Sequence, residues 1–211
     1  MFTVPNVTFS GQFATVDVTL PFTPLFGMVD FNEKLCDAVI DYNQNIYNTG
    51  SYTFPNTNLS LTVDGISDTA FLRVEHNMVA PDEPAQLPEG IARMSQTHYW
   101  NVVVVGNPMP QGEMSFRYQR GNSNNFDYAL MQGYAPENLH LLYRPNAASP
   151  WQFVDVTRTG SPYTGFLKTN HIAAGQYCLA VGDAIAEIPD NTNPAVRIYP
   201  NPTTHYIDIQ V

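Results

Sequence analysis

The sequence has few basic residues. Nine Lys and Arg stand against nineteen Asp and Glu, which gives a formal net charge of -10 at pH 7. Lys34 and Lys168 are the only lysines, and Arg117, Arg120 and Arg144 are too scattered to form a basic patch. An acidic chain repels phosphate groups, so the composition excludes nucleic acid and anionic membranes as expected partners. An acidic surface instead favours solubility or calcium binding.

The chain also lacks long apolar runs. No stretch of about 18 apolar residues occurs, so no transmembrane segment is predicted. The residues that follow Met1 have neither the basic region nor the apolar region of an export leader. If the protein is exported, we expect its leader to lie upstream of Met1.

Cysteine is equally scarce. Cys36 and Cys178 are the only two, an even number that permits one disulfide in an oxidising compartment. They lie far apart on segments with a strand pattern, where cysteines usually behave as small buried apolar residues. Two free thiols are therefore favoured, and a disulfide between Cys36 and Cys178 is the alternative.

Catalytic motifs are missing as well. The chain has no H-E-x-x-H zinc motif, because Glu75 and His76 occur in the reverse order, and it has no G-x-S-x-G nucleophile elbow. The histidines are isolated in the sequence, and they are His76, His98, His140, His171 and His205. Each is predicted to be a surface or hydrogen-bonded residue rather than a metal ligand. We predict that this chain is not an enzyme and has no catalytic residues.

What the sequence does contain is a β pattern. Twelve Tyr and twelve Phe favour strands, while seventeen Pro and thirteen Gly interrupt the chain too often for long helices. Residues 12–20 alternate between two faces, as in a strand with one buried side. Further strands are predicted over residues 26–31, 38–47, 58–63, 70–79, 97–105, 113–118, 139–143, 151–154 and 175–181. Residues 33–45 also fit a helical turn, although the strand interpretation is favoured.

Proline-rich segments divide the chain. Residues 80–90 contain three prolines and cannot run through a sheet ladder, so they mark a domain boundary or a crossover. The predicted fold class is all-β, with two β-sandwich (immunoglobulin-like) domains over residues 1–85 and 86–184. Residues 185–195 then form a linker. Residues 196–211 begin a further strand pair that is too short to bury a core of its own.

The last residues carry a specific motif. A strand pattern ends at Tyr199, Pro200-Asn201-Pro202 and a Thr turn follow, and a second alternating strand begins at His205. The prolines fix the backbone between the strands, and Asn201 suits the turn. This segment resembles the start of a C-terminal sorting domain of the type IX (Por) secretion system. The known domain runs longer, so truncation of the domain is favoured over an abbreviated form.

The resemblance to the sorting domain has consequences for location and partners. It implies that Tyr199, Pro200, Asn201 and Pro202 belong to a sorting signal that the secretion machinery recognises. It also implies an extracellular location or one at the outer-membrane surface.

A second resemblance spans most of residues 6–183. The residues that carry it are Arg73-Val74-Glu75-His76, Ala80-Pro81-Asp82, His98-Tyr99-Trp100-Asn101-Val102, Leu142-Tyr143-Arg144 and Trp151. They are similar to the β-rich regions downstream of the catalytic domain in secreted zinc aminopeptidases of the aminopeptidase N family. This implies a non-catalytic accessory region whose metallopeptidase domain lies upstream. The alternative is a β-sandwich module that binds a polysaccharide or protein substrate.

Three further candidate sites each have a plainer explanation. No cofactor is expected; calcium bound by the carboxylates of Asp64 and Asp68 is the alternative, and a hairpin turn accounts for the same residues. Thr69 lies in an Asp-Thr-Ala sequence that resembles an O-glycosylation site of such bacteria, although a threonine at a strand entry is ordinary. Trp100 and Trp151 fit a stacking platform for a ligand, although core packing is favoured.

Overall fold

The computed structural model describes residues 15–24, 27, 38–82, 84, 86–106 and 109–183, and the backbone of 197–198 and 209–210. The chain divides into two compact units, Met1–Ala38 and Val39–Val211. In the first unit, residues 15–24 form no strand and are mostly exposed. Val16 and Val18 are 47% and 40% exposed, so the strand predicted over residues 12–20 is wrong for its described part.

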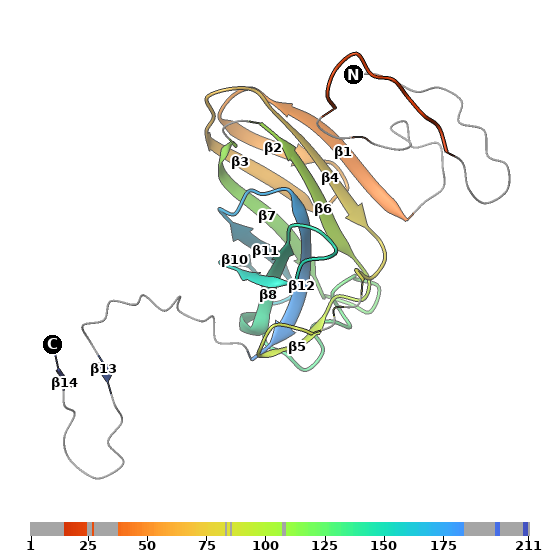
Figure 1. Ribbon diagram of the computed structural model, residues 1–211. Coiled ribbons are helices and arrows are strands. Elements are labelled where there is room, and N and C mark those ends of the chain that lie inside the picture. The colour runs from red at the N-terminus through yellow and green to blue at the C-terminus, as the bar shows by residue number, and fades with distance from the viewer. Residues whose placement is uncertain are drawn as a thin grey trace, which may run out of the picture. The chain divides into compact units, whose positions relative to one another are not determined.

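The second unit is built from antiparallel strands (Figure 1). The larger sheet has the order β1 (Val39–Ile46), β4 (Ala70–Asn77), β6 (Tyr99–Val105), β12 (Gly175–Gly182), β8 (Leu139–Arg144) and β9 (Gln152–Val154), and β5 (Ile91–Met94) also pairs with β12. The smaller sheet has the order β10 (Thr157–Gly160), β11 (Thr164–Thr169), β7 (Gln111–Gln119), β3 (Leu59–Gly65) and β2 (Gly50–Phe54). The prediction of an all-β sandwich is confirmed.

Helical structure is minimal in the described part of the chain. The 3-10 turn η1 (Pro136–Asn138) precedes β8. Two short strands, β13 (Arg197–Ile198) and β14 (Ile209–Gln210), pair with each other near the C-terminus. Among the described residues, no helix has the length and apolar character needed to cross a membrane.

The two domains predicted over residues 1–85 and 86–184 are in fact one sandwich over the described residues between Val39 and Asp183. Both sheets combine strands from either side of residue 85, since β4 pairs with β6 and β3 pairs with β7. The described residues of 80–90 contain no strand, as their prolines predicted, and the flanking strands make this segment a crossover rather than a domain boundary. Prolines exclude a ladder within their own segment, and they do not prevent the flanking strands from pairing with each other.

Alternation along the strands builds the core between the sheets. In β6, Trp100, Val102 and Val104 are buried and the residues between them are half-buried. Phe116 of β7 lies 5.1 Å from the Trp100 ring and 5.0 Å from the Tyr177 ring, and so joins the smaller sheet to the larger one. All three aromatic side chains have 0% exposure. Truncating any of them to Ala would cost about 3–5 kcal/mol of stability.

A second, smaller core lies on the outer side of the larger sheet. It consists of Ile91, Met94, Leu142, Trp151, Cys178 and Ala180. Leu142, Cys178 and Ala180 alternate with the inward-facing residues of β8 and β12, and β5 pairs with β12 beside them. Arg144 lies 4.4 Å from the Trp151 ring and 3.1 Å from Asp82. The segment between β4 and β6 therefore covers part of this face.

Polar side chains also lie on the outer face of the larger sheet. One cross-strand row takes a residue from each of five strands: Asp41, Glu75, Asn101, Gln176 and Arg144. Next to it, Arg73 donates to Asp41 at 2.6 and 2.9 Å and to Glu75 at 2.7 Å. The Arg73 side chain is only 6% exposed, so its guanidinium needs these carboxylates. The ion pairs thus fix β1 against β4.

A glycine marks the closest approach of β3 and β7. Gly112 has a φ of +152°, and a Cβ atom there would lie 1.9 Å from the carbonyl oxygen of Thr62. The strand register shifts at this point, between Val63 and Gly65. Only glycine fits, because any side chain would push the two strands apart.

Dividing the chain between residues 85 and 86 is expected to abolish folding of both parts. Each fragment loses neighbours in both sheets, because β4 is separated from β6 and β3 is separated from β7. Circular dichroism and denaturant titration of the fragments over residues 1–85 and 86–184 should show no cooperative transition, whereas the intact chain should unfold in one. Cooperative unfolding of either fragment alone would contradict the single sandwich.

Candidate functional site

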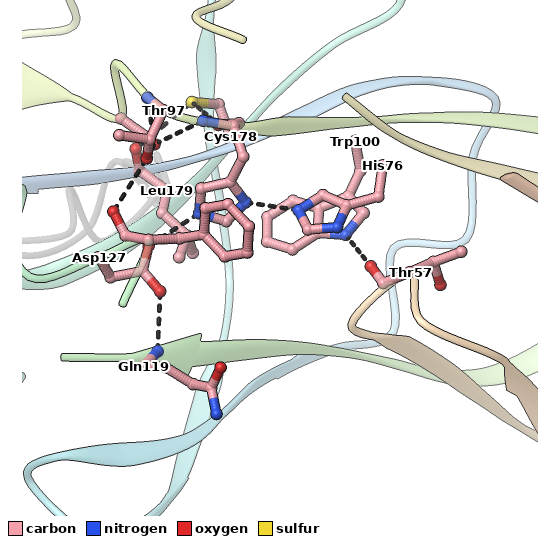
Figure 2. A network of polar contacts seen from close by, with 11 residues as sticks. Thr57, His76, Thr97, Trp100, Gln119, Asp127, Cys178 and Leu179 are labelled. Atoms are coloured by element: carbon pink, nitrogen blue, oxygen red, sulfur yellow. Dashed lines mark hydrogen bonds and ion pairs between the residues drawn. The ribbon is translucent and has the colours of Figure 1, made fainter. Parts of the chain in front are cut away.

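Three titratable side chains meet in the interior of the sandwich (Figure 2). Nε2 of His76 lies 2.8 Å from Nδ1 of His98, and Nε2 of His98 lies 2.8 Å from Oδ1 of Asp127. Their exposed fractions are 0%, 1% and 1%. His76 comes from β4, His98 directly precedes β6, and Asp127 lies in the connection between β7 and β8. The three are hereafter called the His–His–Asp network.

Strand geometry explains why these residues meet. His76 is opposite Trp100 in the β4–β6 ladder, and both side chains point into the core. The two rings are stacked, with centroids 5.1 Å apart and planes 10° apart. His98 is two residues before Trp100, hence on the same face of the extended chain, and its ring lies 4.8 Å from that of Trp100.

Backbone groups complete the polar contacts around the network. The second carboxylate oxygen of Asp127 accepts from the Gln119 N–H at 2.8 Å. The Thr97 hydroxyl donates to the Phe126 carbonyl at 2.9 Å. This hydrogen bond also holds the β7–β8 connection, at the residue before Asp127. The Trp100 indole N–H donates to the Thr57 carbonyl at 2.6 Å (Figure 2). The network therefore ties one long connection to an end of β7 and to the start of β6.

Burial decides the protonation of His76. Removal from water, and then the proximity of His98, lower the pKa of His76 from 6.5 to about 3, although the Asn56 carbonyl favours the protonated form. The contacts are satisfied with both imidazoles neutral, because Asp127 accepts from His98 and His98 accepts from His76. Nδ1 of His76 then has no hydrogen-bond partner among the described residues.

The network contains a histidine and an aspartate, as a hydrolase triad does, but no nucleophile joins them among the described residues. An aspartate that orients a histidine is the base half of a nucleophilic triad. Both ring nitrogens of His98 are already occupied, and no hydroxyl or thiol contacts either imidazole in the described part of the chain. Cys178 is nearby but has 0% exposure, and burial raises the pKa of its thiol to about 12. The described contacts therefore give this buried network a structural role, joining β4, β6 and the β7–β8 connection.

The sequence analysis missed this network. Its prediction that the histidines are isolated is wrong for His76 and His98, and the prediction that they are hydrogen-bonded is right for both. The available signal was the alternation of residues 70–79 and 97–105, which places His76 and His98 on the inner faces of their strands. Asp127 lies in an irregular connection, where no periodicity predicts its direction.

The candidate residues from the sequence lie elsewhere. Trp100 and Trp151 are 0% and 4% exposed, so they are core residues and cannot form a stacking platform. Asp64 and Asp68 are exposed, and the Asp68 carboxylate accepts from the Thr69 N–H at 2.7 Å. No three His, Cys, Asp or Glu side chains converge on a metal position within the described residues. Thr69 is exposed, as a modified residue must be.

The structure describes short segments on either side of the sorting motif. Tyr199, Pro200, Asn201 and Pro202 lie outside the described residues. On either side of them β13 and β14 pair antiparallel, with Arg197 opposite Gln210 and Ile198 opposite Ile209. Cys36 also lies outside the described residues, whereas Cys178 is a free thiol.

No protein family, curated protein or solved structure matches this chain. The functional assignment therefore depends on the residues and contacts described above.

Removing the Asp127 carboxylate is expected to destabilise the protein strongly. The Asp127→Ala substitution leaves the His98 imidazole and the Gln119 N–H buried without their acceptor, which should cost about 3–5 kcal/mol. Urea denaturation measures the loss. The matched control is Asp64→Ala, which removes an exposed carboxylate and should change stability by less than about 0.5 kcal/mol. Equal effects of the two substitutions would contradict the structural role of the network.

Stability should also fall in mild acid because of His76. Between about pH 6.5 and its folded pKa of about 3, the unfolded chain binds a proton that the folded chain does not. The contribution is therefore fully present above about pH 6.5 and is lost as the pH falls toward 3. Between about pH 7.5 and about pH 5, the expected loss is about 2 kcal/mol.

The His76→Gln variant is the comparison for this pH dependence. A glutamine amide can still donate to His98 but does not titrate, so the variant should lose that part of the slope. Urea denaturation at both pH values gives the two slopes. Identical slopes for the two proteins would show that His76 is not the group responsible.

Proposed function

We propose that this chain is a non-catalytic β-sandwich region of an exported protein, with a type IX sorting signal at residues 196–211. In this role the sandwich supports and orients a zinc aminopeptidase-like domain that lies upstream in the same protein. The mature protein is then extracellular or attached to the outer-membrane surface. The secretion machinery is the partner of the last residues.

The observation that carries the export proposal is the pairing of β13 with β14 around the Tyr199–Pro202 motif. A sorting domain of this kind opens with two strands joined by the proline turn. The antiparallel pairing of Ile198 with Ile209 fits that arrangement. The acidic charge of the chain and its few cysteines are compatible with export.

Burial of the chemical groups supports the non-catalytic role. The His–His–Asp network is sealed in the core, and Arg73 is neutralised by the carboxylates of Asp41 and Glu75. Arg73, His76, His98, Trp100, Arg144 and Trp151 are residues that carry the resemblance to the peptidase-associated region, and all six are buried. These core members of the resemblance support a shared architecture more than a shared active site.

Export is tested with substitutions in the complete gene, expressed in a bacterium that has the type IX machinery. Replacing Pro200, Asn201 and Pro202 by Ala should leave most of the protein in the periplasm, because the turn between the strands is lost. Pro194→Ala, in the predicted linker, is the matched control and should be exported normally. Immunoblots of periplasm, cell surface and medium give the distribution. Normal export of the triple variant would overturn the proposal.

A further inference from the structure

The β7–β8 connection, residues 120–138, closes part of the core without a ladder. All of its residues are described, and none of them is in a strand. Its turns are held by hydrogen bonds such as those from the Met131 N–H to the Asp127 carbonyl and from the Tyr134 N–H to the Met131 carbonyl, at 3.0 and 3.2 Å. Leu130 and Met131 are 5% and 1% exposed and belong to the main core. The connection therefore packs like core and is held like a loop.

Side chains from its surroundings attach the connection at its outer side. Arg93 of β5 donates to the Leu130 carbonyl at 2.8 Å and also to the Gln132 carbonyl. The Arg93 guanidinium lies 5.2 Å from the centre of the Tyr134 ring. Arg120, at the start of the connection, donates to the Tyr134 carbonyl at 2.8 Å. Both arginines are only half-buried, so water can replace these contacts when the connection moves.

The inner side of the connection covers the two histidines. The Phe126 ring lies 5.6 Å from the His76 ring and 5.1 Å from the His98 ring. The next residue, Asp127, accepts from His98 (Figure 2). If residues 126 and 127 move away, this side of His76 meets water, while Trp100 remains stacked on His76 within the β4–β6 ladder.

The groups around His76 do not stabilise its protonated form while the connection is closed. The titratable groups that face it are His98, which directly precedes β6, and beyond His98 the Asp127 carboxylate of the connection. Its uncharged neighbours are Ile40 on β1, the Asn56 carbonyl between β2 and β3, Trp100 on β6 and Phe126 of the connection. Burial, and then His98, therefore lower the pKa of His76 to about 3.

Opening of the connection is thus coupled to proton uptake. A hydrated imidazole has its ordinary pKa of about 6.5, so below that pH the opened form binds a proton that the closed form does not. Acid therefore favours opening, and alkaline pH favours closure. Between about pH 7.5 and about pH 5, His76 alone shifts the opening equilibrium about 30-fold. Opening a segment held by turns also costs less free energy than separating paired strands.

We propose that the β7–β8 connection is an acid-released cap, whose opening becomes more frequent in mild acid while the two sheets stay paired. Opening uncovers the His–His–Asp network together with an apolar surface that includes Phe126, Leu130 and Met131. The acid sensitivity derived above concerns the whole sandwich, and the cap yields before the sheets do. This device is additional to the export proposal and does not depend on it.

The test is native-state hydrogen exchange of the full chain, resolved by residue with NMR at pH 7.5 and pH 5. Protection factors correct for the chemical effect of pH on exchange. For the amides of Met131 and Tyr134 they should fall about 30-fold between the two pH values. At pH 5 they should also be at least about tenfold lower than those of the β4 and β6 ladder amides.

Three variants identify the groups responsible. His76→Gln keeps a donor for His98 but does not titrate, so it should lose the 30-fold pH effect at Met131. The matched control is His140→Gln, on the outer face of the larger sheet, which should keep it. Arg93→Ala removes contacts at the outer side of the connection. It should lower the protection of Met131 about three- to tenfold at both pH values and leave the pH effect unchanged.

Circular dichroism of each variant at both pH values shows whether the sheets are intact, and Arg93→Ala tests the cap without a core substitution. Equal protection of the connection and of the ladder at pH 5 would overturn the proposal, since the connection would then open only with the whole sandwich. So would a pH effect that His76→Gln leaves unchanged, or an equal loss of protection in the ladder of Arg93→Ala. Export is measured separately, so the two proposals fail separately.

Discussion

Burial of the Asp127 carboxylate constrains the whole sandwich. A carboxylate taken out of water requires donors for both oxygens, and here His98 and the Gln119 N–H supply them. His98 directly precedes β6 of the larger sheet, and Gln119 is the last residue of β7 in the smaller sheet. The carboxylate thus fixes the long β7–β8 connection to both sheets, and it positions His98 for contact with His76. A neutral amide or an apolar residue could not satisfy both donors.

The buried arginines also need partners for their charges. Arg73 is almost covered on the outer face of the larger sheet, and its guanidinium is matched by two carboxylates. The Arg144 guanidinium contacts the Trp151 ring, the Gln176 side-chain amide and the exposed Asp82 carboxylate. These contacts join strands that are distant in the sequence. In an acidic chain the few arginines can be buried beside carboxylates, and the carboxylates that are not needed for these pairs remain exposed to water.

Much of the fold could be predicted from the sequence, because alternation is a local property. The strand over residues 97–105 places Trp100, Val102 and Val104 on one side, as the structure has them. The same pattern over residues 12–20 forms no strand in its described part, since amphipathic alternation does not supply a neighbouring strand. β10 and β11 were missed because glycine and polar residues dominate them. The domain boundary and the His76–His98 contact both depend on pairing between distant strands, which periodicity cannot specify.

The distribution of chemistry between core and surface favours a module that supports or binds over one that catalyses. Catalysis needs a nucleophile or metal that substrate can reach, next to a base of suitable pKa. In the described residues the histidine pair and Cys178 are sealed from solvent, whereas the side chains of Gln152, Asp155 and Asn170 are exposed. The accessible polar groups of the described sandwich include amides, hydroxyls and carboxylates, while the imidazoles of His76 and His98 and the Cys178 thiol pack in the interior. Substitutions on the surface can therefore leave the core undisturbed.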